Sequence, residues 1–432
     1  MSPGRTGGPD GRGSGPAAPD ARRTVPPAPG DGSPWRGLLR GNVLWLSVAS
    51  FLNDASSEMI FPLLPLFLVG TLGAGPAFLG LVEGVAETTA AFVKLAGGWL
   101  SDRLRRRRAL VAWGYAGAAA TRPLMAAATL PWHVLAIRFG DRIGKGVRSA
   151  PRDALLAESV PGATRGRAFG VHRAADHAGA VLGPLLASGI LLLHPGRLRL
   201  VFALAVIPAA LAVLVVLARV REIAPAGEDR GDPAPGDVPA PAPLQGGGMD
   251  RGFVAFLVVL VLFTLGNASD AFLLLRAADL GVGVALIPLL WGALHVSKTG
   301  WNLVGGAVAD RVGARPALVA GWVVYAGVYA GFALATESWH AWALFVGYGL
   351  FYGLAEPAEK VLVAGMAPSA ARARAFGAYH FAIGIAALPA SVVFGIIWEA
   401  WGAPAAFLFG AALSLAAAAL LPLATRPAGP AA

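Results

Sequence analysis

The stretch GGWLSDRLRRRRAL at residues 97–110 returns later in the chain as GGAVADRVGARPAL at residues 305–318. Each copy starts with a glycine pair and ends in a short basic turn that contains one aspartate, Asp102 or Asp310, 208 positions apart. A motif that repeats at this distance in a chain of 432 residues indicates that the chain consists of two similar halves.

A second pair of segments supports the duplication. GRAFGVHRA at 166–174 matches ARAFGAYHF at 373–381, and their phenylalanines, Phe169 and Phe376, are 207 positions apart. Because two motifs share nearly the same offset, we expect two six-helix halves related by internal symmetry.

The composition places the chain in a membrane. The sequence is 56% hydrophobic and 14% charged, with a mean hydropathy of +0.62, and it contains 57 Gly and 33 Pro. A soluble domain has about 25% charged residues, and Gly and Pro are more frequent in membrane helices than in soluble ones. There is no cysteine, which excludes disulfides, thiolate nucleophiles and Cys-ligated metals.

Twelve apolar segments predict the fold class, an all-α polytopic membrane protein with twelve transmembrane helices in two pseudo-symmetric six-helix bundles. Each segment is long enough to cross a bilayer, which needs about 20 helical residues. The expected spans are 42–69, 78–100, 109–130, 132–157, 168–193, 199–219, 253–275, 285–309, 317–336, 340–364, 375–398 and 404–424.

Polar segments rich in Pro and Gly divide the chain into five parts. We expect a disordered cytoplasmic tail at 1–40, an N-terminal bundle at 41–220, a cytoplasmic linker at 221–252, a C-terminal bundle at 253–425 and a C-terminal tail at 426–432.

The arginines indicate the orientation. Loops on one side carry Arg103, Arg105 to Arg108, Arg165, Arg167, Arg311, Arg315, Arg372 and Arg374, and the opposite loops carry few, with Arg197, Arg199 and Arg276 as exceptions. The positive-inside rule then predicts a multi-pass protein of the plasma (inner) membrane with both termini in the cytoplasm. The net charge of +10 has this source, so no nucleic-acid partner is expected.

The basic turns resemble the loop signature of the major facilitator superfamily, and the resemblance extends over residues from about 40 to 425. It implies a cytoplasmic gate that holds the two halves together until transport breaks the contact. The residues that it assigns to the gate are Gly98, Asp102 and Arg103 in the first half and Gly306, Asp310 and Arg311 in the second. A glycine that the signature expects is Arg105 in the first copy and Gly313 in the second, and the arginine run alone also serves as a topology anchor.

The fourth and fifth spans carry two further motifs. Arg142-Ile143-Gly144-Lys145-Gly146 resembles the family's fourth-helix pattern, whose Arg is linked to proton coupling, although Lys145 replaces the usual Gln. Four residues of the fifth span are spaced as in a motif that resembles the family's antiporter signature: Gly170, Gly179, Gly183 and Pro184. Ala187-Ser188 replaces the last glycines of that signature. Ordinary small-residue packing also accounts for Gly179 and Gly183.

Charged side chains inside apolar spans are costly and mark candidate coupling or substrate sites. Asp54 and Glu58 lie four apart on one helix face. The other candidates are Glu87, Lys94, Arg173, Asp176, Asp270 and Lys298. The repeat offset relates Arg152-Asp153 to Glu359-Lys360 with the order of charges swapped, and we expect Glu359 and Lys360 to belong to the cytoplasmic gate. Static ion pairing that stiffens a bundle is the alternative role for each of them.

These features favour a secondary active transporter that works by alternating access and exports a small molecule in exchange for protons. An importer or facilitator has the same fold, and a membrane-embedded enzyme or an accessory sensor is a more distant alternative. The sequence has no H-E-x-x-H and no G-x-S-x-G, so we expect no catalytic residues, metal or cofactor. The expected partners are the substrate, protons and membrane lipid, with the protein as a monomer.

Overall fold

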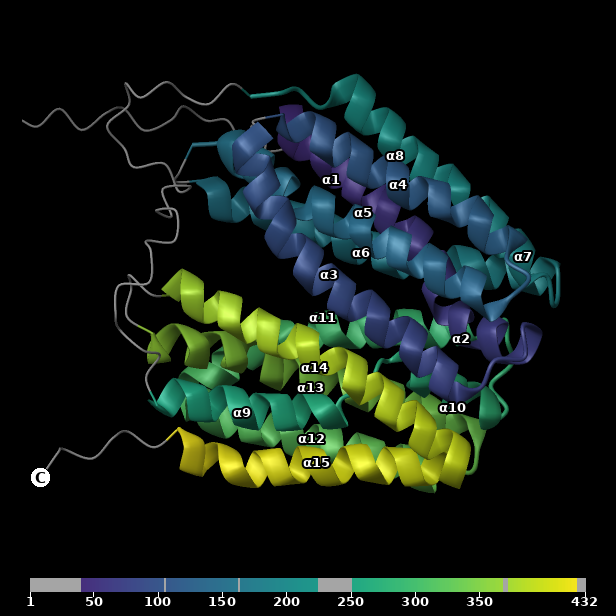
Figure 1. The fold of residues 1–432 in the computed structure, drawn as a ribbon, viewed down its shortest axis with the longest axis vertical. Helices are drawn as coiled ribbons and strands as arrows, with labels where there is room; N and C mark the ends of the chain where they lie inside the picture. The colour runs from purple at the N-terminus through teal and green to yellow at the C-terminus, as the bar shows by residue number, and fades with distance from the viewer. Residues whose placement is uncertain (1–39, 105, 162–163, 224–250, 368–371, 426–432) are drawn as a thin grey trace, which may run out of the picture. The chain divides into compact units, whose positions relative to one another are not determined.

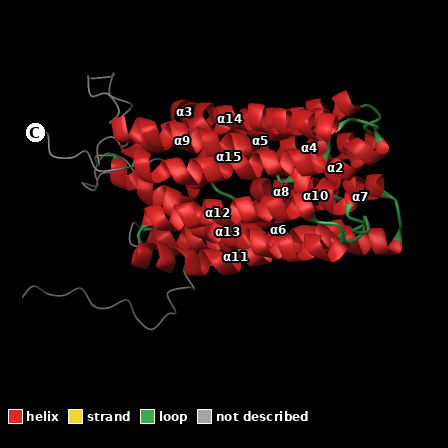
Figure 2. Ribbon diagram, turned by 90° about the horizontal axis from the view of Figure 1, so that it is seen from below, coloured by secondary structure: helices red, strands yellow, loops and turns green. Residues whose placement is uncertain are grey.

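The computed structural model describes residues 40–104, 106–161, 164–223, 251–367 and 372–425, without the side chains at positions 95, 98–102, 104, 303, 372 and 373. Helices are the regular elements of these ranges (Figure 1, Figure 2). The expected tails and most of the expected linker lie outside the described residues, so their predicted boundaries stay predictions.

Helical segments correspond to all twelve expected spans. The first bundle contains α1 (Gly41–Ile60) with the continuing turns η1 (Phe61–Leu63), α2 (Leu64–Leu66) and η2 (Phe67–Thr71), then α3 (Pro76–Leu104), α4 (Arg107–Ala127), α5 (Pro131–Glu158), α6 (Arg165–Leu193), α7 (Leu198–Leu204) and α8 (Val206–Arg219). The second bundle contains α9 (Arg251–Gly266), α10 (Ala271–Asp279), α11 (Ile287–Val312), α12 (Ala314–Leu334), α13 (Ser338–Met366), α14 (Arg372–Trp401) and α15 (Ala403–Ala424).

Eight of the described helical segments are long and apolar enough to cross a membrane by length and composition alone. The helices that fall short of that measure are α4, α5, α11 and α13. α4 and α5 are less apolar than their neighbours because they carry polar and charged side chains that face other helices, such as Arg122 of α4 and Arg142 of α5.

The helices run side by side, so the molecule has two ends (Figure 1). We call the end at which α1 begins and α15 ends the terminal side, and the end at which α3 begins and α14 ends the distal side.

The two bundles repeat the same packing, as the duplicated motifs predict. In the first, α3 packs on α5, α5 on α4, and α1 on α6 and α8; in the second, the equivalent helices α11, α13, α12, α9, α14 and α15 make the matching contacts. The most extensive contacts between the bundles are α3 with α14 and α6 with α11, and the repeat converts one of these pairs into the other.

Glycines allow the α3–α14 contact to be very close. A Cβ atom on Gly80 would overlap the backbone carbonyl of Ser391, and one on Gly84 would lie 2.8 Å from the Cα atom of Leu388. Thr88 Oγ1 donates a hydrogen bond of 2.7 Å to the Gly384 carbonyl oxygen in the same contact. We call this contact the sealed seam, because it closes the boundary between the bundles over the distal half of the two helices.

Two of the arginines that are exceptions to the positive-inside rule donate hydrogen bonds to backbone carbonyl groups. Arg199 Nη1 donates to the carbonyl oxygen of Ala126 at 2.7 Å, and Arg276 Nη2 donates to the carbonyl oxygen of Ala335 at 2.8 Å. Both therefore satisfy carbonyl groups at helix ends, where a cation is also favoured by the helix dipole.

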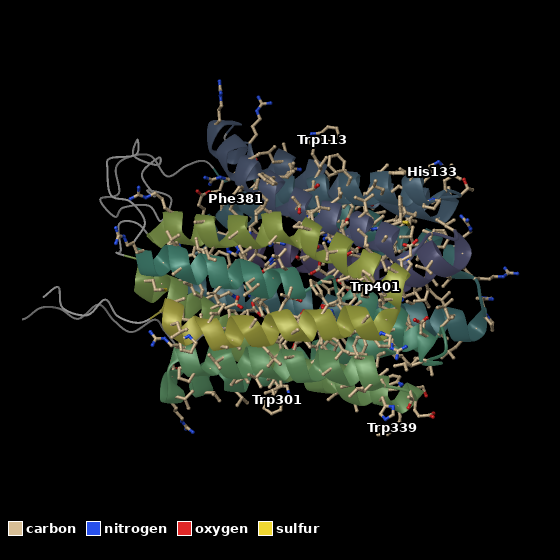
Figure 3. All side chains as sticks on the ribbon, turned by 60° about the horizontal axis from the view of Figure 1, so that its bottom comes forward. Trp113, His133, Trp301, Trp339, Phe381 and Trp401 are labelled. Atoms are coloured by element: carbon tan, nitrogen blue, oxygen red, sulfur yellow. The ribbon has the colours of Figure 1, made fainter. Side chains whose placement is uncertain are left out.

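Turn and interface residues follow the expected pattern. Gly313 has a φ of 92°, a left-handed conformation that lets the chain reverse directly between α11 and α12. Trp132, Trp339 and Trp401 are exposed at the distal ends of helices, where Trp commonly anchors a membrane protein, and Figure 3 shows Trp339 pointing outward.

The sealed seam generates a prediction. In Gly80→Ala the added methyl group meets backbone rather than a movable side chain, so the distal-closed state should lose about 1–3 kcal/mol. That loss shifts the population about 5- to 150-fold toward distal-open states. A cysteine replacing the buried Ser391 should then become several-fold more reactive toward a water-soluble maleimide.

The matched control is Gly189→Ala, because a Cβ atom on Gly189 meets nothing within 4 Å. Equal reactivity of the cysteine at position 391 in the Gly80→Ala, Gly189→Ala and parent backgrounds would show that the seam tolerates the methyl group and is not a gate.

Candidate functional site

The first bundle holds a buried ion pair at the boundary with the second. Arg138 of α5 contacts both carboxylate oxygens of Glu83 of α3, at 2.6 and 2.9 Å, and the two side chains are 9% and 1% exposed. Ser269, which precedes α10, donates its hydroxyl to Glu83 at 3.3 Å. The pair therefore links α3, α5 and the second bundle near the distal side.

A second buried pair ties α4 to α5 and α1. Arg122 Nη1 lies 3.2 Å from Asp141 Oδ1, and its Nε donates to Ser56 Oγ at 3.1 Å. The Ser56 hydroxyl in turn donates to the carbonyl oxygen of Ala205 at 2.7 Å. In this series from Asp141 through Arg122 and Ser56 to the Ala205 carbonyl, each polar group is the partner of the next.

The predicted residue Arg142 pairs with the predicted residue Glu87. Arg142 Nη2 lies 3.0 Å from Glu87 Oε1, and the Glu87 side chain is 52% exposed while that of Arg142 is nearly buried. Lys145 is exposed and belongs to the electrostatic surroundings of both. Lys94, about two turns beyond Glu87 on the same face of α3, is also exposed and is an electrostatic neighbour of His380 in α14.

Asp54 and Glu58 differ from these acids because no salt bridge involves either of them among the described residues. Asp54 accepts a hydrogen bond of 3.1 Å from the amide of Asn53. Glu58 accepts a hydrogen bond of 2.7 Å from the indole N–H of Trp291, which belongs to α11 in the second bundle. Trp291 also packs on Phe61, with ring centroids 5.0 Å apart.

The predicted residues Arg173 and Asp176 of the fifth span form an ion pair at a long distance. Arg173 Nη1 and His172 Nε2 lie 3.6 and 3.7 Å from the carboxylate oxygens of Asp176. The Arg173 side chain is 73% exposed, and it is an electrostatic neighbour of Glu356 across the boundary between the bundles.

In the second bundle, Asp270 lies at the centre of a tyrosine cluster. The hydroxyl groups of Tyr348 and Tyr352 donate to its two carboxylate oxygens at 3.0 and 2.8 Å. The ammonium of Lys298 lies 3.3 Å from the centre of the Tyr352 ring, a cation–π contact. A neighbouring cavity of about 340 Å³ is lined by Asn267 and Tyr352, among other residues of α9, α13 and α14.

The predicted gate residues are only partly described. The positions of Gly98 and Asp102 fall in α3, but their side chains lie outside the described set. Arg103, Asp310 and Arg311 are exposed at the terminal side, and a Cβ atom on Gly306 would meet nothing within 4 Å. Asp310 has no salt bridge among the described residues, so the gate stays a prediction.

Glu359 and Lys360 have different partners in the structure, and their role as a gate stays a prediction. Lys360 lies 2.8 Å from Glu356 on an exposed face, and the buried Glu359 accepts a hydrogen bond of 2.6 Å from Tyr379 of α14. Adjacent residues on a helix point about 100° apart, which explains their different partners.

The antiporter-like motif packs α6 against α1. A Cβ atom on Gly179 would overlap the carbonyl of Phe51, and one on Gly183 would overlap that of Ala55, on either side of Asp54. Pro184 instead lies next to Gly292 of α11, whereas Gly170 has open space around it. Gly179 and Gly183 therefore allow α6 to pack closely against α1.

Sequence reasoning missed several members of the site. Arg122, Arg138 and Asp141 are charges inside apolar spans and could have been found by that signal. Trp291 and Tyr379 carry no charge, and their role depends on contacts between helices that spacing along one helix does not reveal. Tyr348 and Tyr352 lie four apart, a spacing that places both on one face.

Comparison with known proteins agrees with this geometry. The family model described as Major Facilitator Superfamily matches residues 46–297 and 252–432. The chain belongs to the major facilitator superfamily. An "uncharacterized MFS-type transporter" of Methanocaldococcus jannaschii is 31% identical over 389 residues, which cover 89% of this chain and 94% of that protein.

A shorter similarity and a structural one extend the comparison. The multidrug resistance protein MdtH of Cronobacter sakazakii is 34% identical over 123 residues, 28% of each chain. A mutant of the nucleoside transporter NupG has a similar structure, with a TM-score of 0.74 over 89% of this chain and all of the other, at 16% identity. The protein is therefore a multi-pass membrane protein and a secondary transporter of this superfamily, whose relatives here are transporters rather than enzymes.

The Glu83–Arg138 pair yields a stability prediction. Removing one partner leaves a buried charge alone, so Glu83→Gln or Arg138→Met should each cost about 3–5 kcal/mol, and the double variant should cost less than the sum. Thermal unfolding in detergent, followed by tryptophan fluorescence, measures the effect. Glu356→Gln removes the exposed Glu356–Lys360 pair and should cost about 1 kcal/mol or less.

Strictly additive losses in the double variant would contradict direct coupling of Glu83 with Arg138. If Glu356→Gln loses as much stability as Glu83→Gln, then burial of the ion pair does not determine how much stability its removal costs.

The gate interpretation yields a second prediction. If Asp310 closes the terminal side, Asp310→Asn should shift the protein toward terminal-open states by about 5- to 150-fold. A cysteine replacing the exposed His380 should then react faster, and one replacing Ser391 more slowly. Asp102→Asn, at the repeat-equivalent position, should act in the same direction.

Asp279→Asn, at the distal end of α10, is the control and should leave both reactivities unchanged. If Asp310→Asn behaves like this control, Asp310 has no part in a gate.

Proposed function

We propose that this transporter exports a small molecule by proton-coupled antiport, with Glu58 and Asp54 as the proton-carrying pair. The observation that carries the proposal is the hydrogen bond from Trp291 to Glu58, because it joins a membrane carboxyl of one bundle to the other bundle. Alternating access moves one bundle against the other, so this contact changes during each cycle.

The partners of the acids separate structural roles from coupling roles. Glu83, Asp141 and Glu87 each lie within 3.2 Å of an arginine, which favours their ionised form in every state that keeps the pair. Glu58 and Asp54 lack such a partner among the described residues and depend on uncharged donors. A carboxyl of this kind can bind a proton when its donor withdraws and release it when the donor returns.

Glu87 and Arg142 form the adjoining part of the same region. Lys145 and Arg142 are electrostatic neighbours of both Glu58 and the half-exposed Glu87. Glu87 is in turn an electrostatic neighbour of Asp270 across the boundary. We assign substrate contact to this mixed-charge region, which leaves the charge of the substrate open to either sign.

The arginine distribution supports an orientation with both termini in the cytoplasm of the plasma membrane. In that orientation the terminal side faces the cytoplasm and the sealed seam closes the path to the outside. Similarity to a multidrug resistance protein and the glycine–proline motif of α6 support export over uptake.

Glu58→Gln and Trp291→Phe test the coupling. The amide can still accept the indole hydrogen bond but cannot release a proton, so Glu58→Gln should abolish uphill transport and retain counterflow exchange. Trp291→Phe keeps an aromatic ring and removes the donor, at a cost of about 1.5–3 kcal/mol for a bond to a charged group, or roughly a 10- to 150-fold lower uphill rate.

The measurement is flux in proteoliposomes under an imposed pH gradient, with a panel of drugs and metabolites and an internal pH dye. Trp301→Phe is the matched control on the same helix, because Trp301 is exposed (Figure 3) and makes none of the side-chain hydrogen bonds found among the described residues. Wild-type uphill flux in Glu58→Gln would remove Glu58 from the mechanism, and flux that follows the proton gradient inward would replace export by uptake.

A further inference from the structure

The two boundaries between the bundles are related by the repeat but differ in structure. His177 of α6 and Gly384 of α14 are 207 positions apart, and Ala91 of α3 and Thr299 of α11 are 208 apart, so the pairs are equivalent. In the sealed seam, a Cβ atom on Gly384 would overlap Ala91. In the other, the same positions hold two larger polar side chains, His177 and Thr299.

A groove of about 510 Å³ occupies this second boundary. It is lined from α6 by His177, Val181, Leu182 and Leu185, and from α11 by Val296 and Thr299. Leu185 and Val296 are 50% and 59% exposed, so the apolar wall of the groove is accessible from outside.

Helix geometry places the groove on the outer face of α6. Gly179 and Gly183 face α1, and Val181 is two positions from each of them, about 200° around the helix. Val181 and the neighbouring groove residues therefore point away from the first bundle. In a membrane protein that direction is occupied by lipid.

The polar residues of the groove lie near the middle of their helices. His177 is near the centre of α6 and Thr299 near the centre of α11, and both are exposed. Polar and ionisable side chains are rare at that depth and mark functional positions unless they are paired. A polar pair in an apolar groove suits a molecule with an apolar body and a hydrogen-bonding head group.

The groove leads toward the coupling residues. His295 is an electrostatic neighbour of His177, and its Nε2 is buried without a hydrogen-bond partner among the described residues. The His295 ring packs edge-on against Trp291 at a centroid distance of 5.0 Å, and Trp291 donates to Glu58. His295 therefore lies between the groove and the hydrogen bond that joins Trp291 to Glu58.

We propose that this groove is a lateral binding site through which an amphipathic substrate dissolved in the bilayer reaches the region of Glu58. The proposal rests on the proposed function for the direction of transport, but the site itself is defined by His177, Thr299 and the apolar wall. Its occupant has an acyl chain or ring system for Leu185 and Val296 and a hydrogen-bonding head for the histidines. The sealed seam lacks the space for such a molecule.

A photoreactive fatty acid tests the site. The full chain is reconstituted in vesicles of phosphatidylcholine and phosphatidylglycerol with a small fraction of palmitic acid that carries a diazirine on its chain. After irradiation, peptide mass spectrometry should find the label at residues 177–185 and 296–299, and an excess of unlabelled palmitate should displace it. Residues 80–91 of the sealed seam should stay unlabelled.

Ala178→Trp fills the groove from an exposed position of α6 and should lower the labelling about fivefold or more. Leu186→Trp adds the same side chain on an exposed part of α6 outside the groove and should leave the labelling unchanged. Labelling that palmitate does not displace, or that Ala178→Trp does not lower, would show contact with bulk lipid chains only and overturn the proposal.

The outcomes separate this site from the proposed function. Displaceable labelling without proton-coupled export in the flux assay supports the groove and contradicts the proposed direction or coupling. Proton-coupled export without displaceable labelling overturns the groove and leaves the proposed function standing.

Discussion

A charged side chain at membrane depth needs a partner inside the protein, and the first bundle is organised around this requirement. Arg122, Arg138 and Arg142 each contact a carboxylate from another part of the bundle, at 3.2, 2.6 and 3.0 Å. These pairs fix how α3, α4 and α5 lie against one another. The same requirement makes the acids without a cationic partner, Asp54 and Glu58, stand out as the groups whose charge can change.

The second bundle solves the same packing problem with aromatic rings. Trp322 stacks on Phe263 at 4.6 Å and Tyr325 on Tyr329 at 4.1 Å, all in the buried core. Two of its acids, Asp270 and Glu359, accept hydrogen bonds from tyrosine hydroxyls. One duplicated backbone therefore carries a polar bundle and an aromatic bundle, and function is expected where their faces meet.

Much of the fold could be predicted from the sequence, because the repeat offset and the apolar spans depend on local composition. The site was harder. Spacing placed Asp54 with Glu58 on one face, but a partner on another helix, such as Glu87 for Arg142 or Trp291 for Glu58, depends on packing that no single-helix pattern encodes. Glu359 and Lys360 show the limit most clearly. The repeat relates them to Arg152 and Asp153, but it does not reveal that their partners are Tyr379 and Glu356.

The replacement of Gly384 and Ala91 by His177 and Thr299 at equivalent positions gives the molecule two unlike flanks in the plane of the bilayer. A neighbouring membrane protein that settled against α3 and α14 would cover a surface already closed by backbone contact. One that settled against α6 and α11 would cover the groove. Crowding in the membrane therefore acts on this protein differently from its two flanks, although both descend from the same duplicated segment.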